Sequence, residues 1–248
     1  MPRIFVYDSG VGNIPIAEAI NSELPNAELF LVSDTAFFPY GEKEDSALIQ
    51  RALVVLENTI SELTPDVLVL GCNTLSTIAL EVIRKRFNMP VVGVVPAIKP
   101  AALKSKSKVI GLIATPATIH RAYTNNLISD YASDCDIIRV GSTELVHMAE
   151  GKVTGKDIDC EQLRKILQPF LRAKETKSLD QLVLGCTHFP ILRDEIAHYL
   201  TDVEIQDSSA AIGKQVSRRV SELRNNVATS SSWQHFSINV KGQLTSFS

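Results

Sequence analysis

The sequence predicts an α/β protein built from two similar lobes, each with a mainly parallel sheet flanked by helices. Short β-branched apolar runs alternate with amphipathic helical patterns along the chain. These runs are continuously hydrophobic, which is typical of parallel strands that are covered on both faces. In each half, the third strand ends in the same five residues, "LVLGC", at 68–72 and again at 182–186. The repeat indicates two equivalent strand ends.

Four strands are expected in each half of the chain, between helices whose apolar residues form one stripe. The expected strands are 4–8, 28–34, 67–73, 91–95, 109–115, 136–141, 182–187 and 203–207. The clearest amphipathic helices are 48–63, 75–87 and 161–173. We expect the first lobe to cover 1–95, with 210–248 returning to it through a helix at 209–223 and a short segment at 235–240. The second lobe is expected over 96–209, entered by a crossover at 96–108.

Composition excludes several classes of protein. The chain has 248 residues, 45% of them hydrophobic and 21% charged, which is ordinary for a globular protein with ample core. Its net charge of -3 does not favour a nucleic acid or an anionic membrane as a partner. The longest apolar runs are far shorter than the roughly 18 residues of a membrane span. The short apolar run at the N-terminus stops at Asp8, so no signal peptide is expected.

The four cysteines show neither a CxxC motif nor metal-ligand spacing. Four cysteines in a chain of this length do not make a disulfide scaffold. We therefore expect a cytoplasmic protein without a metal site. Its oligomeric state is not decided by the sequence, and a homodimer remains one option.

Polar residues gather where the predicted strands end. They are Asp8, Ser9, Asn73, Thr74, Thr115, Thr118, Thr187, His188, Asp207 and Ser208. Ligands of open parallel sheets bind beyond the carboxyl ends of the strands. Because each cluster precedes a helix, hydroxyls and free backbone N–H groups are expected to form a site for a carboxylate or a phosphate.

Cofactor motifs are weak or absent in this sequence. The glycines of "DSGVGN" suggest dinucleotide binding, but the third glycine is missing and no acidic partner follows at the right spacing. We reject that interpretation. The chain has no Walker A loop and no histidine pair at metal spacing. No motif excludes a lysine for pyridoxal phosphate, but no lysine stands at a strand end of this kind.

A single cysteine at the end of a buried strand is most often a core residue. Here Cys72 and Cys186 stand at equivalent positions of the two lobes, each beside a helix N-terminus, where thiols become reactive thiolates. His188, which would otherwise be taken as structural, becomes a candidate proton partner for Cys186. Cys135 and Cys160 lack this setting and are assigned no role.

Two thiols that face one cleft between the lobes would suit inversion of a carbon centre by proton transfer. One base removes a proton from one face of the carbon, and the conjugate acid of the other returns a proton to the opposite face. The two groups exchange their roles when the reaction runs in reverse. A nearly symmetric pair of thiols fits this chemistry.

These residues resemble those of the glutamate racemases within the aspartate/glutamate racemase superfamily. The resemblance runs along nearly the whole chain and rests on several motifs together. They are "DSGVGN" near the N-terminus, "FPYG" at 38–41, "GCNT" at 71–74, "GVVPAIKPA" at 93–101, "LGCTHFP" at 184–190 and "DSS" at 207–209. As a set they are specific, although each motif alone would be weak.

The resemblance implies two α/β lobes with an active site in the cleft between them, and no cofactor. It implies that Cys72 and Cys186 are the acid/base pair, assisted by Asp8 and His188 respectively. Glu150 matches an acidic position near the site. The substrate contacts implied by the resemblance are Asp8, Ser9, Tyr40, Gly41, Asn73, Thr74, Thr118, Thr187 and His188. The product, D-glutamate, would supply peptidoglycan synthesis.

Two positions depart from the family pattern. Asn13 stands where a second glycine is usual, which we expect to affect backbone geometry near Asp8, and His147 replaces a more usual proline. Neither departure touches the cysteine pair. Some relatives are described as partners of DNA gyrase, a role that the sequence neither supports nor excludes.

Three other interpretations remain open at the level of sequence. The first is a racemase for another small or acidic amino acid, with aspartate the leading candidate. The second is a binding protein that keeps the site without catalysis, although binding alone needs no paired cysteines. The third is a redox switch that joins Cys72 to Cys186, which is disfavoured because a substrate must fit between them.

Overall fold

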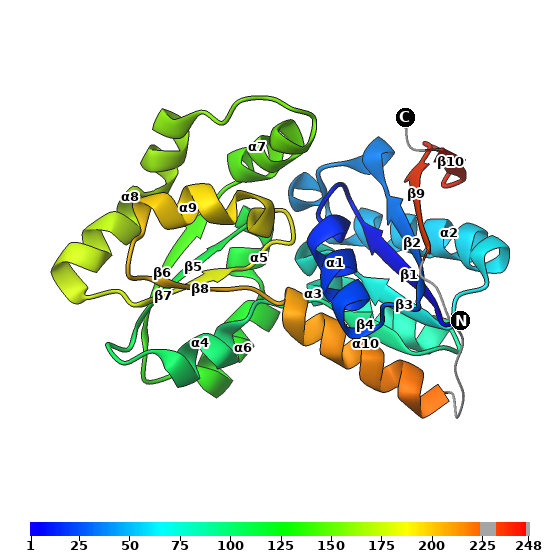
Figure 1. Cartoon of the computed structure of the whole chain (residues 1–248), viewed down its shortest axis with the longest axis horizontal. Helices are drawn as coiled ribbons and strands as arrows, with labels where there is room; N and C mark the ends of the chain where they lie inside the picture. The colour runs from blue at the N-terminus through cyan, green and yellow to red at the C-terminus, as the bar shows by residue number, and fades with distance from the viewer. Residues whose placement is uncertain (224–231, 247–248) are drawn as a thin grey trace. The chain divides into compact units, whose positions relative to one another are not determined.

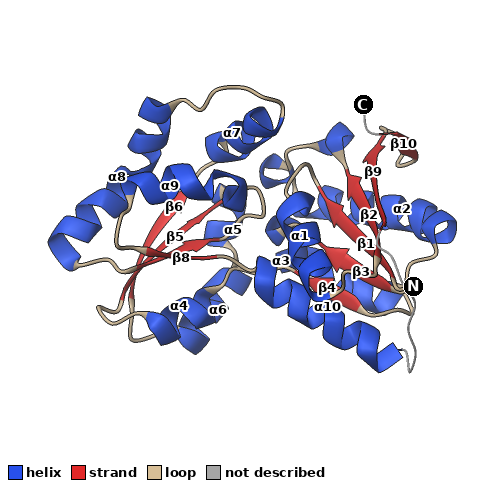
Figure 2. Cartoon of the chain, viewed as in Figure 1, coloured by secondary structure: helices blue, strands red, loops and turns tan. Residues whose placement is uncertain are grey.

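The computed structural model describes residues 1–223 and 232–246, and the chain divides into two compact units (Figure 1). The first unit contains residues 1–94 together with the segment that begins at Ser209, and the second contains Val95–Ser208. Each unit has its own sheet. Both sheets are flanked by helices, so the predicted α/β class is confirmed (Figure 2).

The first unit holds a six-stranded sheet with the order β10-β9-β2-β1-β3-β4. Its strands are β1 (Arg3–Asp8), β2 (Glu28–Ser33), β3 (Val67–Leu70), β4 (Val91–Gly93), β9 (Ser232–Ile238) and β10 (Leu244–Ser246). All neighbouring pairs are parallel except β10 with β9. Its helices are α1 (Asn13–Glu23), α2 (Asp45–Leu63), α3 (Asn73–Arg86) and α10 (Ser209–Leu223), with short 3-10 helices η1 (Thr35–Phe37) and η2 (Tyr40–Glu42).

Alternate residues of β1 enter two separate cores. Phe5 and Tyr7 pack with buried residues of α2 and α3, whereas Ile4 and Val6 pack with α1 and α10 on the opposite face. Successive side chains of a strand point to opposite faces of the sheet, and both faces are covered here. This is why the strand is hydrophobic without alternation.

Helix α10 packs closely against α1 through one glycine. A Cβ atom on Gly213 would lie 2.5 Å from the carbonyl oxygen of Ala19. Only glycine allows this approach of the two backbones. The contact ties the segment that follows Ser209 to the first unit.

The second unit holds a parallel four-stranded sheet with the order β6-β5-β7-β8. The strands are β5 (Val109–Ala114), β6 (Asp136–Gly141), β7 (Gln181–Leu184) and β8 (Glu204–Gln206). The helices are α4 (Ile98–Lys104), α5 (Pro116–His120), α6 (Ala122–Tyr131), α7 (Glu144–Val153), α8 (Cys160–Lys177) and α9 (Arg193–Tyr199), with the 3-10 helix η3 (Phe189–Leu192).

The helices of the second unit cover both faces of its sheet (Figure 2). Residues of α4 and α6 join Ile110 and Leu112 of β5 in one core. On the other face Phe170 of α8 reaches Gly111, where an added Cβ would lie 2.9 Å from the ring. The glycine therefore makes room for the ring between α8 and the sheet.

Several expected element boundaries differ from the structure by a few residues, most informatively at the Gly-Cys pairs. Strand β3 ends at Leu70, not at residue 73, and β7 ends at Leu184, because the Gly-Cys pairs leave the sheet and lead into the next helices. The crossover at 96–108 contains a helix, α4, which buries Ile98, Ala101 and Ala102. Their spacing of three and four residues places them on one helical face.

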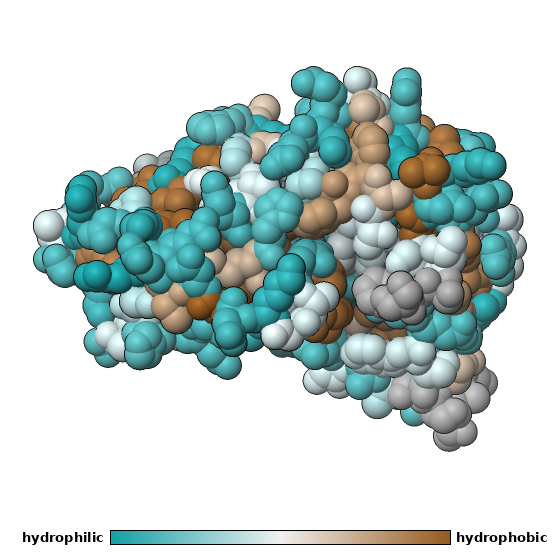
Figure 3. All heavy atoms as spheres, turned by 90° about the horizontal axis from the view of Figure 1, so that it is seen from above, coloured by the Kyte–Doolittle hydropathy of each residue, from teal (hydrophilic) through white to brown (hydrophobic). Residues whose placement is uncertain are grey.

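No helix within residues 1–223 and 232–246 has the length and apolar character needed to cross a membrane. The face seen from above is mostly hydrophilic, with hydrophobic residues in separate areas (Figure 3). Within the described chain, the most exposed large hydrophobic residues are Val240 at 79% and Leu103 at 77%, and they lie in different units.

Asp180, just before β7, fixes the loop that leads into β5. Its carboxylate accepts hydrogen bonds from the Ser105 hydroxyl at 2.6 Å and from the backbone N–H groups of Lys106 at 2.6 Å and Ser107 at 3.0 Å. Burial alone would raise the pKa of Asp180, but these bonds outweigh it and lower the pKa below its usual value. The charged carboxylate is thus stabilised in the folded state.

We expect Asp180→Asn to lower the free energy of unfolding by about 1–2 kcal/mol at pH 7, since an amide offers only one acceptor oxygen to donors on two sides. A lowered folded pKa stabilises the protein above the unfolded pKa, and this stabilisation is lost as pH falls through the folded pKa. The difference between wild type and variant should therefore shrink below about pH 4. Chemical denaturation at several pH values measures it, with Asp157→Asn in an exposed loop as control. A difference that is independent of pH would contradict the assignment.

Candidate functional site

The two Gly-Cys pairs have the same local geometry in their separate units. The N–H of Gly71 donates to the carbonyl of Tyr7 on β1, and the N–H of Gly185 donates to the carbonyl of Ile113 on β5, both at 2.7 Å. A Cβ on either glycine would lie 3.3 Å from that same carbonyl oxygen. Each glycine therefore lies tightly against the neighbouring strand, which is one physical reason for the repeated motif.

The cysteine that follows each glycine stands at the carboxyl end of its strand and is nearly buried. Cys72 is 6% exposed and caps α3, where its carbonyl accepts from the N–H of Ser76. Cys186 is 7% exposed, and its carbonyl accepts from the N–H of Phe189 in η3. Neither cysteine takes part in a disulfide within the part of the chain that the structure describes. The structure thus gives the two thiols matching positions at the starts of helical segments.

In the first unit, Asp8 at the end of β1 is fully buried. Its Oδ1 accepts hydrogen bonds from the N–H groups of Ser9 and Gly10 at 2.5 and 3.2 Å, and from the Ser9 hydroxyl at 3.2 Å. Its Oδ2 faces the "GCNT" segment, because a Cβ atom on Gly71 would lie 3.7 Å from this oxygen. The carboxylate is therefore anchored on one side and directed toward the turn that carries Cys72.

Asn73 and Thr74 form the first turn of α3 and are both buried. Among the described residues, the side-chain oxygen of Asn73 has no hydrogen-bond partner. A buried acceptor without a partner costs free energy, typically about 1–3 kcal/mol. This oxygen is therefore ready to accept a hydrogen bond from a ligand.

In the second unit, Cys186, His188 and Glu150 form a chain. The Nδ1 atom of His188 lies 3.9 Å from the Cys186 sulfur, and its Nε2 lies 2.8 Å from Oε1 of Glu150 on α7. His188 is 2% exposed. A carboxylate on Nε2 favours the tautomer with its proton there, and in this tautomer Nδ1 is an acceptor toward the Cys186 thiol.

Thr187 and Thr118 are buried near the carboxyl ends of β7 and β5. Thr118 lies inside α5, and its Oγ1 accepts a hydrogen bond from the hydroxyl of Thr115 at 2.9 Å. Thr115 caps this helix by accepting from the Thr118 N–H. The Thr118 hydroxyl therefore already takes part in the cap.

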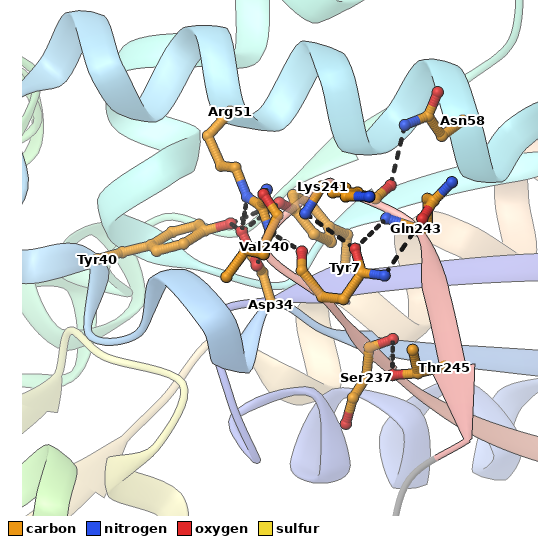
Figure 4. A network of polar contacts seen from close by, with 12 residues as sticks. Tyr7, Asp34, Tyr40, Arg51, Asn58, Ser237, Val240, Lys241, Gln243 and Thr245 are labelled. Atoms are coloured by element: carbon orange, nitrogen blue, oxygen red, sulfur yellow. Dashed lines mark hydrogen bonds and ion pairs between the residues drawn. The ribbon is translucent and has the colours of Figure 1, made fainter.

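Tyr40 was predicted to contact substrate, but its hydroxyl lies in the interior of the first unit. It donates to Oδ2 of Asp34 at 2.7 Å and also bonds to the Tyr7 hydroxyl (Figure 4). Burial, reinforced by the charge of Asp34, raises the pKa of both tyrosines well above the usual value. The hydroxyl of Tyr40 is committed to this network, so a ligand contact at Tyr40–Gly41 would come from the backbone.

Sequence reasoning did not identify Asp34 or Arg51, which complete this network. Asp34 is fully buried and follows β2, so the strand-end rule applied to Asp8 could have found it. Arg51 stands on α2 one turn from the buried Leu48 and Val55. Its guanidinium donates to the carboxylate through two nitrogens, Nε at 2.8 Å and Nη2 at 2.7 Å. A lone arginine in a helix carries no such signal.

The first two residues of the "DSS" motif, Asp207 and Ser208, end the second unit and are held by hydrogen bonds within it. Asp207 pairs with Arg193 of α9, and the Ser208 hydroxyl donates to the carbonyl of Val95. Within the described part of the chain, no group of three or more His, Cys, Asp or Glu residues is arranged to hold a metal ion.

Comparison with curated proteins supports the resemblance predicted from the motifs. Glutamate racemase of Shewanella loihica is 45% identical over 215 residues, which is 86% of this chain and 79% of that protein. Glutamate racemase of Shewanella woodyi is 46% identical over 220 residues, covering 88% and 81%. That of Pectobacterium atrosepticum is 43% identical over 225 residues, covering 90% and 78%.

Solved structures agree with the sequence relatives. Escherichia coli glutamate racemase, in complex with L-glutamate and the activator UDP-MurNAc-Ala, matches with a TM-score of 0.90 at 37% identity, over 96% of this chain and 90% of that one. The enzyme from Aquifex pyrophilus matches with a TM-score of 0.71 at 30% identity, over 94% and 88%. The family model described as Asp/Glu/hydantoin racemase matches residues 15–216. The chain therefore belongs to the Asp/Glu/hydantoin racemase family.

Proposed function

We propose that this protein is a cofactor-independent racemase that interconverts L-glutamate and D-glutamate through Cys72 and Cys186. The observation that carries the proposal is the matched placement of two nearly buried cysteines, neither in a disulfide, after β3 and β7. The names of the curated relatives support glutamate as the substrate, as does the E. coli structure that holds L-glutamate.

The proposed reaction needs two groups of opposite protonation state. One cysteine, as thiolate, takes the α-proton and breaks the Cα–H bond. The other, as thiol, donates its proton to the opposite face of the planar carbanion and forms the new bond. The electron pair left at Cα is thus used in the second step, and no redox change occurs. General acid–base catalysis of this type is typically worth about 10²–10⁴-fold for a positioned group.

The neighbours of the thiols suit these roles. We propose that His188 Nδ1 holds the proton of Cys186 while Glu150 stabilises the imidazolium, as the spacing of 3.9 and 2.8 Å supports. Asp8, anchored by Ser9 and Gly10, would assist Cys72 in the same way. Cys186 would thus be assisted by an imidazole and Cys72 by a carboxylate.

The remaining predicted residues would hold glutamate. Hydroxyls and N–H groups at helix starts can bind its carboxylates without a positive side chain. The unpartnered oxygen of Asn73 could accept a hydrogen bond from the substrate ammonium. Backbone at Tyr40–Gly41 would contribute in place of the Tyr40 hydroxyl. The proposed substrate contacts are Asp8, Ser9, Tyr40, Gly41, Asn73, Thr74, Thr118, Thr187 and His188.

The test is incubation of purified protein with L-glutamate and no added cofactor, followed by circular dichroism at a fixed wavelength. The signal should decay to zero, since the equilibrium mixture of enantiomers is racemic. A parallel incubation with D-glutamate should decay to the same value from the opposite sign. A constant signal from folded protein would defeat the proposal.

Glutamate should be preferred over aspartate by more than the roughly 1–3 kcal/mol of one methylene in a fitted pocket. The shorter side chain would either leave its carboxylate donors unpaired or draw the α-carbon away from the thiols. The resemblance of "GCTHFP" to the motif of the glutamate racemases implies that His188 also favours glutamate over aspartate. Measured kcat/KM for the two L-acids decides this. Comparable values, or a preference for aspartate, would overturn the substrate assignment but not the two-thiol mechanism.

In D2O, the product enantiomer should carry deuterium from the earliest time points, while recovered substrate carries little. Two separate bases hold separate protons, and the donating thiol has already exchanged with solvent. A single base would return the original hydrogen to the product. Mass spectrometry of the separated enantiomers measures the label, and strong retention of hydrogen in the product would contradict the two-thiol model.

We place this activity in the cytoplasm, where the free thiols of all four cysteines would persist. Its product would feed peptidoglycan synthesis, as the resemblance to glutamate racemases implies. A homodimer is the assembly to test first by sedimentation or light scattering.

A further inference from the structure

The C-terminal hairpin consists of β9, the turn at 239–243 and β10. It extends the sheet of the first unit by pairing with β2, a strand from the beginning of the chain. Strand β9 pairs in parallel with β2, with Leu31 opposite His235 and Ser33 opposite Ser237. Strand β10 then pairs with β9 at the edge of the sheet. The hairpin is therefore held beside β2, whose end carries two buried polar residues.

The first of these, Ser33, connects the hairpin to the loop after Asp8. Its hydroxyl donates to the carbonyl of Gly10 at 2.9 Å and accepts from the side-chain amide of Asn13 at 2.9 Å. It also lies 3.0 Å from Nε2 of His235 on β9. A serine hydroxyl has one proton, which here goes to the Gly10 carbonyl, so we assign Nε2 of His235 as the donor to Ser33.

This contact reaches the backbone that holds the proposed catalytic carboxylate. The N–H of Gly10 donates to Asp8 while its carbonyl accepts from Ser33, so the residue is held on both sides. Asn13 adds an amide donor to the same hydroxyl. This second hydrogen bond strengthens the connection.

The second buried residue, Asp34, connects the turn of the hairpin to Tyr40. Arg51 donates through Nη2 to the carbonyl of Asn239 at 2.6 Å and through Nη1 to that of Val240 at 2.8 Å. The same guanidinium forms an ion pair with Asp34, whose carboxylate also accepts a hydrogen bond from the Tyr40 hydroxyl (Figure 4). One arginine therefore joins the turn to the segment that contains Tyr40–Gly41.

We propose that the C-terminal hairpin is a positioning element for the two substrate loops of the first unit, acting through His235–Ser33 and Arg51–Asp34. The inference rests on the proposed function, because it takes 8–10 and 40–41 as substrate-contacting segments. His235, Ser33 and Arg51 are positioning residues, since each acts through another residue. Loops that are fixed before binding cost less to order when the substrate arrives.

The test compares His235→Leu, which has no donor, with His235→Gln, whose amide can still donate to Ser33. Gln234→Ala is the matched control, because Gln234 neighbours His235 on β9 and bonds to the exposed side of Glu28. We expect His235→Leu to raise KM for both enantiomers roughly fivefold or more with kcat nearly unchanged, the pattern for lost uniform binding. His235→Gln and Gln234→Ala should stay within about twofold of wild type.

Amide hydrogen exchange gives a readout that does not depend on activity. The N–H groups of Ser9 and Gly10 should exchange faster in His235→Leu than in Gln234→Ala, while β4 amides such as Val92 keep their protection. Equal exchange of Ser9 and Gly10 in the two variants would overturn the inference. If wild type failed to racemise glutamate, the proposed function would fall while this measurement still decided the positioning role.

Arg51→Lys is the second variant, which serves if His235→Leu does not fold. A lysine keeps the charge beside Asp34 but cannot bind both carboxylate oxygens and two carbonyls at once. We expect it to raise KM more than it lowers kcat, and Arg86→Lys in an exposed pair to change neither. An unchanged KM in folded Arg51→Lys would count against the second connection.

Discussion

Replacement of Cys72 or Cys186 by alanine should lower kcat/KM by about 100-fold or more, and in both directions of the reaction. Each thiol acts as base in one direction and as acid in the other, so its loss removes a needed group from both. The equilibrium constant between enantiomers is fixed near unity, so a lesion cannot slow kcat/KM in one direction alone. Polarimetry or circular dichroism started from each enantiomer provides the two values.

The other two cysteines offer matched controls. Cys135 lies just before β6 and Cys160 begins α8, away from the Gly-Cys turns. Cys135→Ala and Cys160→Ala should therefore keep near wild-type rates. If Cys72→Ala or Cys186→Ala also kept them while remaining folded, that cysteine would be a core residue. The proposed mechanism would then lose one of its two bases.

The sequence predicted the class of fold because burial on both faces of a parallel sheet leaves a direct mark. In β1, Phe5 and Tyr7 enter one core while Ile4 and Val6 enter another, and no polar residue can alternate with them. The ends of strands were less predictable. Cys72 and Cys186 continue the apolar runs, yet their glycines have already turned the chain out of the sheet.

Much of the candidate site was predictable from polar residues at strand ends and from the family motifs. The chain of Cys186, His188 and Glu150 joins the "LGCTHFP" motif to helix α7 through contacts of 3.9 and 2.8 Å. The contribution of the hairpin was not predictable. His235 and Ser33 are 202 residues apart, and only the pairing of β9 with β2 brings them together. Long-range contacts of this kind leave no local pattern.

The same limit applies to Tyr40. The "FPYG" motif marks the segment as important, but the motif does not say which atoms face a ligand. The Tyr40 hydroxyl bonds to Asp34 and to Tyr7, both of which lie on or beside other strands. The hydrogen bond from Tyr40 to Asp34 is part of a network in which Arg51 supplies the positive charge opposite Asp34.

Arg51→Met should lower the free energy of unfolding by about 3–5 kcal/mol, the usual cost of removing one partner of a buried ion pair. Asp34 is fully buried and the Arg51 side chain is 11% exposed, so the remaining carboxylate cannot recover water. The hydroxyls of Tyr7 and Tyr40 would still donate to Asp34. The turn carbonyls of Asn239 and Val240 would lose their donor as well. Urea denaturation followed by the fluorescence of Trp233, the single tryptophan of the chain, reports on this unit directly.

Two further variants separate the charge from the packing. Arg86→Met removes an exposed ion pair with Glu57, whose side chains are 57% and 44% exposed, and should cost no more than about 1 kcal/mol. The double variant Asp34→Asn with Arg51→Met removes both buried charges, so it should be more stable than Arg51→Met alone. If the double variant were the less stable of the two, the cost would come from the lost tyrosine and carbonyl contacts and not from an unpaired carboxylate. The geometry of Figure 4 favours the first outcome, because the guanidinium meets both carboxylate oxygens in a two-pronged pair.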